Sequence, residues 1–284
     1  MPFPVFLAVL LGAALHAGWN AIVKSGVDKM LTTVLVAAAS GLVGLIALPF
    51  VAQPAPASWP FLATSAMLQV AYFALVAGAY RAADLAQVYP LMRGLAPALV
   101  AIIGYLWLGD HLGPAAWAGV ALISAGVLSL ALGYSRAPDG SPRRSRAGVW
   151  LALANAGVIA SYTLIDGAGA RASGAPVGYA MWLFVLNALP LVAWGLIARR
   201  RALLAYARAN LRPGLAGGLG NVGAYAIALW AMTKAPVAMV AALRETSILF
   251  AMAIAALLLG ERLGPGRLAA AALVALGAIS LRLA

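Results

Sequence analysis

The chain is a succession of long apolar stretches, each of about 20 residues, which is the length that crosses the hydrocarbon core of a bilayer as a helix. Short polar or basic connections separate them. Apolar and polar residues do not alternate strictly, as they would in strands, and only helices or closed barrels satisfy backbone polar groups in lipid. We therefore expect ten transmembrane helices, near residues 3–23, 31–51, 61–80, 85–108, 115–132, 147–165, 177–198, 214–232, 237–259 and 267–283.

The composition supports a membrane protein. The chain is 64% hydrophobic and 9% charged, whereas soluble domains carry about 25% charged residues. A soluble chain this apolar would expose large patches and aggregate. The formal net charge of +12 does not indicate nucleic-acid binding, because most arginines lie in short connections, where the positive-inside rule and the anionic cytoplasmic leaflet favour them. We expect a multi-pass protein of the cell's inner membrane.

A repeat divides the chain into two halves of five expected helices each. The segment Leu108-Gly109-Asp110-His111-Leu112-Gly113-Pro114 recurs without a gap as Leu259-Gly260-Glu261-Arg262-Leu263-Gly264-Pro265, at an offset of 151 positions (Asp110 to Glu261). The same offset places Arg93 on Arg244. Five is an odd number, so the second copy enters the membrane from the opposite side and the repeats are inverted. We expect a first repeat at 1–134, a basic linker at 135–146 and a second repeat at 147–284.

These segments resemble the drug/metabolite transporter superfamily, specifically its ten-helix members with paired EamA-type repeats. His16-Ala17-Gly18-Trp19-Asn20 and the segment 89–97 carry the resemblance as well, and it extends over essentially the whole chain. The resemblance implies an all-α integral membrane fold that transports amino acids, related metabolites, nucleotide-linked sugars or amphipathic drugs. It does not specify the substrate, because members diverge widely. The Asp110-His111 pair is less typical of the family than Glu261-Arg262.

Charges inside expected spans are the sharpest functional signal. An arginine near the bilayer centre costs about 2.5–3.5 kcal/mol on insertion scales, so Arg93 and Arg244 should face the bundle interior or a wet cavity. They would either bind an anionic group such as a carboxylate, or form structural pairs. Glu245 is the only carboxylate within an expected span. It is a candidate for proton coupling, with an ion pair to an arginine as the alternative that we favour.

Polar residues on the first expected helix indicate a cavity wall. His16, Asn20 and Lys24 are spaced four residues apart and share one helix face, with Trp19 beside it. The alternatives are hydrogen bonds between helices for His16 and Asn20 and an interfacial anchor for Lys24.

Aromatic side chains complete the predicted site. Tyr89, Tyr162 and Tyr225 could stack on an organic substrate, while Tyr80 fits the interfacial aromatic belt better. Asn221 lies in a glycine-rich segment and is a candidate polar cavity residue. The predicted substrate-binding residues are thus His16, Trp19, Asn20, Tyr89, Arg93, Tyr162, Asn221, Tyr225 and Arg244, with Glu245 as the coupling candidate.

Other function classes fit less well. The seven acidic residues are scattered, two histidines do not make a histidine-rich metal site, and no ATP-binding motif is present. A membrane-embedded enzyme and a channel are the alternatives from other function classes; we expect neither catalysis nor a cofactor. We predict a secondary transporter of small organic metabolites that works by alternating access, and amino acids are the substrates that we favour most. We expect a monomer to suffice, with the substrate, the bilayer and possible coupling protons as partners. The basic connections at 136–146 and 199–212 place both termini outside, against the family's habit of both inside.

Overall fold

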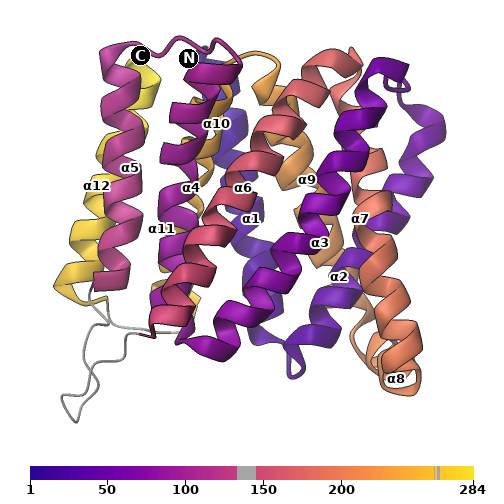
Figure 1. The fold of residues 1–284 in the computed structure, drawn as a ribbon. Helices are drawn as coiled ribbons and strands as arrows, with labels where there is room; N and C mark the ends of the chain where they lie inside the picture. Colours follow the sequence, from indigo (N-terminus) through magenta and orange to yellow (C-terminus); the bar gives the residue numbers. More distant parts are fainter. Residues whose placement is uncertain (133–144, 259, 261–262) are drawn as a thin grey trace.

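The structure, a computed structural model, describes residues 1–132, 145–258, 260 and 263–284. These residues form helices and no strands, and ten segments are long and apolar enough to span a membrane. The predicted all-α fold with ten spans is therefore confirmed (Figure 1). The first half contains α1 (Phe3–Ser25), α2 (Lys29–Ala47), α3 (Trp59–Ala82), α4 (Leu85–Trp107) and α5 (Pro114–Leu132). The second half contains α6 (Arg146–Ser173), α7 (Pro176–Ala198), α8 (Arg200–Ala209), α9 (Leu211–Met232), α10 (Val237–Arg244), α11 (Ser247–Leu258) and α12 (Pro265–Leu283).

The two halves run through the bundle in opposite directions. Both termini lie at one end, whereas α5 ends and α6 begins at the other (Figure 1). The packing repeats accordingly: α2 packs on its equivalent α7, α5 packs on its equivalent α12, and α3 packs on α6 as α9 packs on α1. The predicted inverted five-helix repeats are confirmed. Most of the predicted linker at 135–146 falls outside the described residues.

Glycines let α5 and α12 approach closely, in a contact that the repeat makes twice. A Cβ on Gly277 would lie 2.8 Å from the carbonyl oxygen of Gly119, and a Cβ on Gly126 would lie 2.9 Å from that of Ala270. Gly126 is the repeat equivalent of Gly277, and Gly119 is that of Ala270, at the offset of 151. Small residues at both crossings allow backbone-to-backbone packing, which is how helices associate in lipid.

Helix α6 is longer than predicted, and this corrects one expectation. It extends through Ser173 rather than ending near residue 165, and it stops at Gly174, whose φ of 62° is the left-handed conformation of a helix C-cap. Asp166 therefore lies inside a membrane helix and is fully buried. The prediction that Glu245 is the only carboxylate within a span is wrong, because the predicted span ends one residue before Asp166 whereas the helix continues to Ser173.

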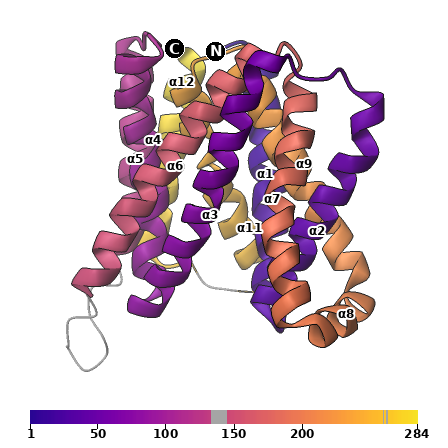
Figure 2. The same ribbon diagram turned by 45° about the vertical axis from the view of Figure 1, so that its right-hand side comes forward.

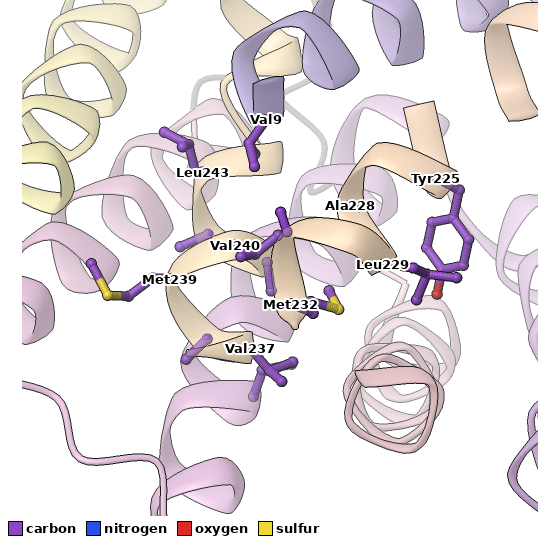
Figure 3. Packing of buried hydrophobic residues seen from close by; sticks show 14 of the residues in the cluster. Val9, Tyr225, Ala228, Leu229, Met232, Val237, Met239, Val240 and Leu243 are labelled. Atoms are coloured by element: carbon purple, nitrogen blue, oxygen red, sulfur yellow. The ribbon is translucent and has the colours of Figure 1, made fainter. Parts of the chain in front are cut away.

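The ninth span is interrupted at its centre. Helix α10 ends at Arg244 and α11 begins at Ser247, so that Glu245 lies in the turn between them. Apolar side chains pack around this region, among them Val240 and Leu243 of α10, Met232 of α9 and Val9 of α1 (Figure 3). Broken helices near the midplane place charged groups and free backbone ends at transporter binding sites.

A short amphipathic helix, α8, was not predicted from the sequence. It lies at the end opposite the termini (Figures 1 and 2), where Leu203 is buried against Val34 of α2 and Tyr206 shares a 2.8 Å hydrogen bond with Thr32.

Basic residues gather at this end of the bundle. Far more described lysines and arginines lie at this end than at the termini end. Those at this end are Lys24, Lys29, Arg81, Arg146, Arg199, Arg200, Arg201, Arg208, Arg212 and Arg267, and those at the termini end are Arg171, Lys234 and Arg282.

Candidate functional site

Arg93 and Glu245 form a bidentate ion pair between the two halves. Nε of Arg93 donates to Oε2 of Glu245 at 3.0 Å, and Nη2 lies 2.8 Å from Oε1. The two side chains are only 13% and 9% exposed. Glu245, the predicted coupling residue, is thus engaged in the arginine pair that the sequence analysis favoured as the alternative, and the charge of Arg93 is neutralised.

Arg244 has a different environment although it is the repeat equivalent of Arg93. Its guanidinium carbon lies 4.8 Å from the centroid of the Tyr225 ring, a cation–π contact. Among the described residues it makes no ion pair with a carboxylate. The asymmetry has a sequence origin, because the repeat equivalent of Glu245 is Gly94, which offers no acid. Arg244 is therefore not neutralised by an ion pair among the described residues.

A small cavity lies between the two arginines at the contact of α4, α6 and α10. Its volume is about 10 Å³, roughly the minimum that holds one water molecule. The bundle is therefore closed around this point, and a metabolite would enter only when the helices move apart. The polar lining residues are Arg93, Tyr162, Thr163, Arg244 and Glu245, and the apolar ones are Ala96, Pro97, Val100, Ile159 and Ala241.

Beside Arg244 lies a carboxylate that the sequence analysis did not place in the site. Asp166 of α6 is fully buried, and its two oxygens accept hydrogen bonds from the hydroxyls of Tyr179, at 3.1 Å, and Tyr225, at 2.6 Å. Tyr225 therefore contacts Asp166 through its hydroxyl and Arg244 through its ring. The signal was present in the sequence, since Asp166 follows Tyr162 by four residues and so shares its helix face.

The polar face predicted on α1 is only partly available to a ligand. The His16 and Trp19 rings meet edge to face, with centroids 5.2 Å apart. Nδ2 of Asn20 donates to the carbonyl oxygen of His16 at 2.8 Å, a bond within the helix. The indole Nε1 of Trp19 is buried and has no hydrogen-bond partner among the described residues, so its N–H is an unused donor there.

Of the nine predicted substrate-binding residues, three line the central cavity: Arg93, Tyr162 and Arg244. Asn221 donates from Nδ2 to the Ser40 hydroxyl at 3.1 Å, so it joins α9 to α2 instead. Tyr89 precedes Arg93 by one turn on α4 and is 36% exposed. The other predicted residues on the central helices, Arg93, Tyr162, Tyr225 and Arg244, are brought together.

The termini end is closed by a polar cluster around the first copy of the repeated loop. Oδ2 of Asp110 accepts from the backbone N–H of Val237 at 2.9 Å, at the start of α10, and Oδ1 lies 3.2 Å from Nη1 of Arg171. Nε of Arg171 donates to the carbonyl oxygen of Met232 at 2.9 Å, at the end of α9. The loop thus joins the ends of α6, α9 and α10. The acidic and basic residues of the second copy, Glu261 and Arg262, fall outside the described residues.

Comparison with known proteins gives matches at three levels. A model of the EamA-like transporter family matches residues 3–132 and 146–283. A curated protein of Sinorhizobium sp, described as an uncharacterized transporter in the cobO 3'region, is 41% identical over 75 residues, which are 26% of this chain and 52% of that protein. The match thus spans about half the length of the curated relative. A crystal structure with no named function superposes with a TM-score of 0.76 at 19% identity, covering 100% of this chain and 98% of the other, which supports the fold alone.

Proposed function

Since the chain belongs to the EamA-like transporter family, a branch of the drug/metabolite transporter superfamily, we propose that it is a secondary transporter of small carboxylated metabolites, with amino acids as the first candidates. The family assigns a general role in metabolite transport across a membrane. The substrate class and the alternating-access mechanism are proposals that rest on the chemistry of the central residues.

The observation that carries the substrate class is the unneutralised guanidinium of Arg244 beside the central cavity. A guanidinium binds a carboxylate through two parallel hydrogen bonds, which gives orientation as well as affinity. The rings of Tyr162 and Tyr225 offer apolar contact for a side chain of the same molecule. A purely cationic drug would be repelled by Arg244, so carboxylates are favoured over such drugs.

The inverted repeat supports alternating access. Inverted halves place the site at the midplane and open it to either side by rocking one bundle against the other. Arg93 comes from the first half and Arg244 from the second, so the central residues belong to both moving parts. A cavity of about 10 Å³ with both arginines on its wall fits a closed intermediate of such a cycle.

The test is a counterflow assay with the purified protein in proteoliposomes. Vesicles loaded with unlabelled amino acid are diluted into labelled amino acid, beginning with L-leucine and L-phenylalanine. We expect saturable counterflow by the wild type and its loss in Arg244→Ala. Arg208→Ala is the matched control, because Arg208 is an exposed arginine on α8. Full counterflow in Arg244→Ala would refute the site, and passage that does not saturate would indicate a channel.

A further inference from the structure

Resting on the proposed function, we propose that Asp166 is the proton-binding residue of the transporter and that its proton moves in the same direction as the substrate carboxylate. This assigns the coupling role to an acid of α6 rather than to Glu245. Glu245 holds a bidentate contact with Arg93, so a proton on Glu245 would break an ion pair between the halves.

Asp166 differs in its partners from the described acids that form ion pairs with arginines. Asp28 pairs with Arg199, Asp110 pairs with Arg171, and Asp84 has an interaction of its own. Among the described residues, Asp166 is fully buried and makes no ion pair. A buried carboxylate without a bound cation is costly, because desolvation strongly disfavours its charged form.

The groups around Asp166 come from four other helices. Tyr179 of α7 and Tyr225 of α9 donate to its oxygens, and donors of this kind stabilise the ionised form. Arg244 of α10 contacts the ring of the same Tyr225, and Ser65 is a buried residue of α3, which packs on α6. Tyr162 lies one turn away on α6 itself. Burial favours the neutral carboxyl while the donors and Arg244 favour the charged one, so a local rearrangement can change its protonation.

The contact through Tyr225 links the proton to the substrate. When Asp166 is ionised, its negative charge offsets part of the positive charge of Arg244. A proton on Asp166 removes that offset, so Arg244 attracts a substrate carboxylate more strongly. By thermodynamic linkage, the bound carboxylate in turn favours the protonated Asp166. Proton and substrate therefore bind together, and both are released at the opposite face of the membrane when the site opens there.

The position of Asp166 on α6 is consistent with entry of the proton from one end of the bundle. It lies one turn beyond Tyr162, toward the end of the bundle where Arg171 and the termini lie. That end is poor in basic residues, so it faces the outside under the positive-inside rule. A proton would enter from outside when the Asp110–Arg171 contact opens.

The experiment compares two readouts of the wild type and Asp166→Asn in the same proteoliposomes. One is L-leucine counterflow at equal pH on both sides, which needs no net proton movement. The other is uphill accumulation of L-leucine driven by an acidic exterior. We expect Asp166→Asn to keep counterflow within about threefold of the wild type and to lose accumulation by at least about tenfold. Asp28→Asn is the matched control, because Asp28 is an acid of a surface connection.

The two readouts separate the proposals. If the wild type gives no counterflow, the proposed function fails. If counterflow is present but an acidic exterior drives no accumulation, or drives export instead, the proton assignment is overturned and the transporter remains. Accumulation that survives in Asp166→Asn also overturns it. Should Asp166→Asn lose counterflow as well, proton uptake on addition of L-leucine is compared at weak buffering between the detergent-solubilised wild type and Asp166→Asn. Uptake by the wild type alone supports the assignment, whereas equal uptake by both, or none by the wild type, refutes it.

Discussion

Arg93 and Glu245 meet through two contacts, Nη2 to Oε1 at 2.8 Å and Nε to Oε2 at 3.0 Å, although they lie in opposite halves of the chain. The pair lies at the point where the ninth span breaks between α10 and α11. It neutralises one of the two equivalent central arginines, whereas the other, Arg244, contacts the ring of Tyr225 and makes no ion pair among the described residues.

The first prediction concerns the stability that this pair provides. Glu245→Gln should leave the guanidinium of Arg93 buried without a counter-charge, which typically costs about 3–5 kcal/mol. The double variant Arg93→Met, Glu245→Leu should be less destabilised than Glu245→Gln, because it removes both charges. Thermal unfolding in detergent, followed by loss of the monodisperse species, measures both. A double variant that melts below Glu245→Gln would contradict the assignment.

The second prediction concerns the contact between α5 and α12. In Gly277→Ala the new Cβ would lie 2.6 Å from Cγ1 of Ile123 and 2.8 Å from the carbonyl oxygen of Gly119, so the helices must separate. We expect a loss of about 1–3 kcal/mol. Gly266→Ala on the same helix is the control, because its Cβ meets nothing within 4 Å. Equal melting temperatures for the two variants would refute the close approach.

The sequence predicted the spans and the inverted repeat well, because both follow from long-range patterns. Hydropathy locates helices, and the match of Asp110 to Glu261 at one fixed offset specifies the topology. The residue-level site was harder. Asn221 follows Gly217 by four residues, so the two share a helix face, but only the structure places that face on Val36 of α2 rather than on the cavity.

Side-chain contacts between helices explain the remaining differences between the predicted site and the observed one. The choice of Arg93 rather than Arg244 as the partner of Glu245 depends on how α4 packs on α10, which spacing does not specify. Asp166 lies one residue beyond the span predicted at 147–165. Its burial depends on donors from α7 and α9, which are remote in the sequence.

The third prediction concerns pH and the N-terminus of α2. The backbone N–H of Leu31, which donates to Asp28 at 3.0 Å, and the Arg199 guanidinium hold the pKa of the Asp28 carboxyl below its usual value. A lowered pKa stabilises the fold above the unfolded-state pKa of about 3.9 and ceases to do so as the pH falls through the folded value.

Unfolding of Asp28 variants at pH 7 and near pH 3 checks this relationship. Asp28→Ala should lose about 1 kcal/mol at pH 7, mainly because the helix loses its N-cap. Asp28→Asn keeps a capping oxygen and should lose less. The difference between Asp28→Ala and the wild type should shrink toward pH 3. A difference that stays constant with pH would show that the carboxylate charge contributes nothing.

The fourth prediction concerns orientation in the membrane. The basic end with α8 should face the cytoplasm and the termini should lie outside. The chain has no cysteine, so single probes can be introduced at exposed sites. Lys234→Cys, at the termini end, should react with a membrane-impermeant maleimide on intact cells. Arg208→Cys, on α8, should react only after permeabilisation, and the reverse pattern would place both termini inside.

The most direct test of the account is whether Arg244 recognises the carboxylate of the substrate. The measurement is the ratio of counterflow rates for L-leucine and L-leucine methyl ester, which lacks the free carboxylate. The wild type should prefer L-leucine at least about tenfold, since removing a partner of a charged hydrogen bond costs about 1.5–3 kcal/mol. In Arg244→Ala the residual ratio should approach one. A wild type that transports both compounds equally, or an Arg244→Ala variant that keeps the full preference, would contradict the central claim.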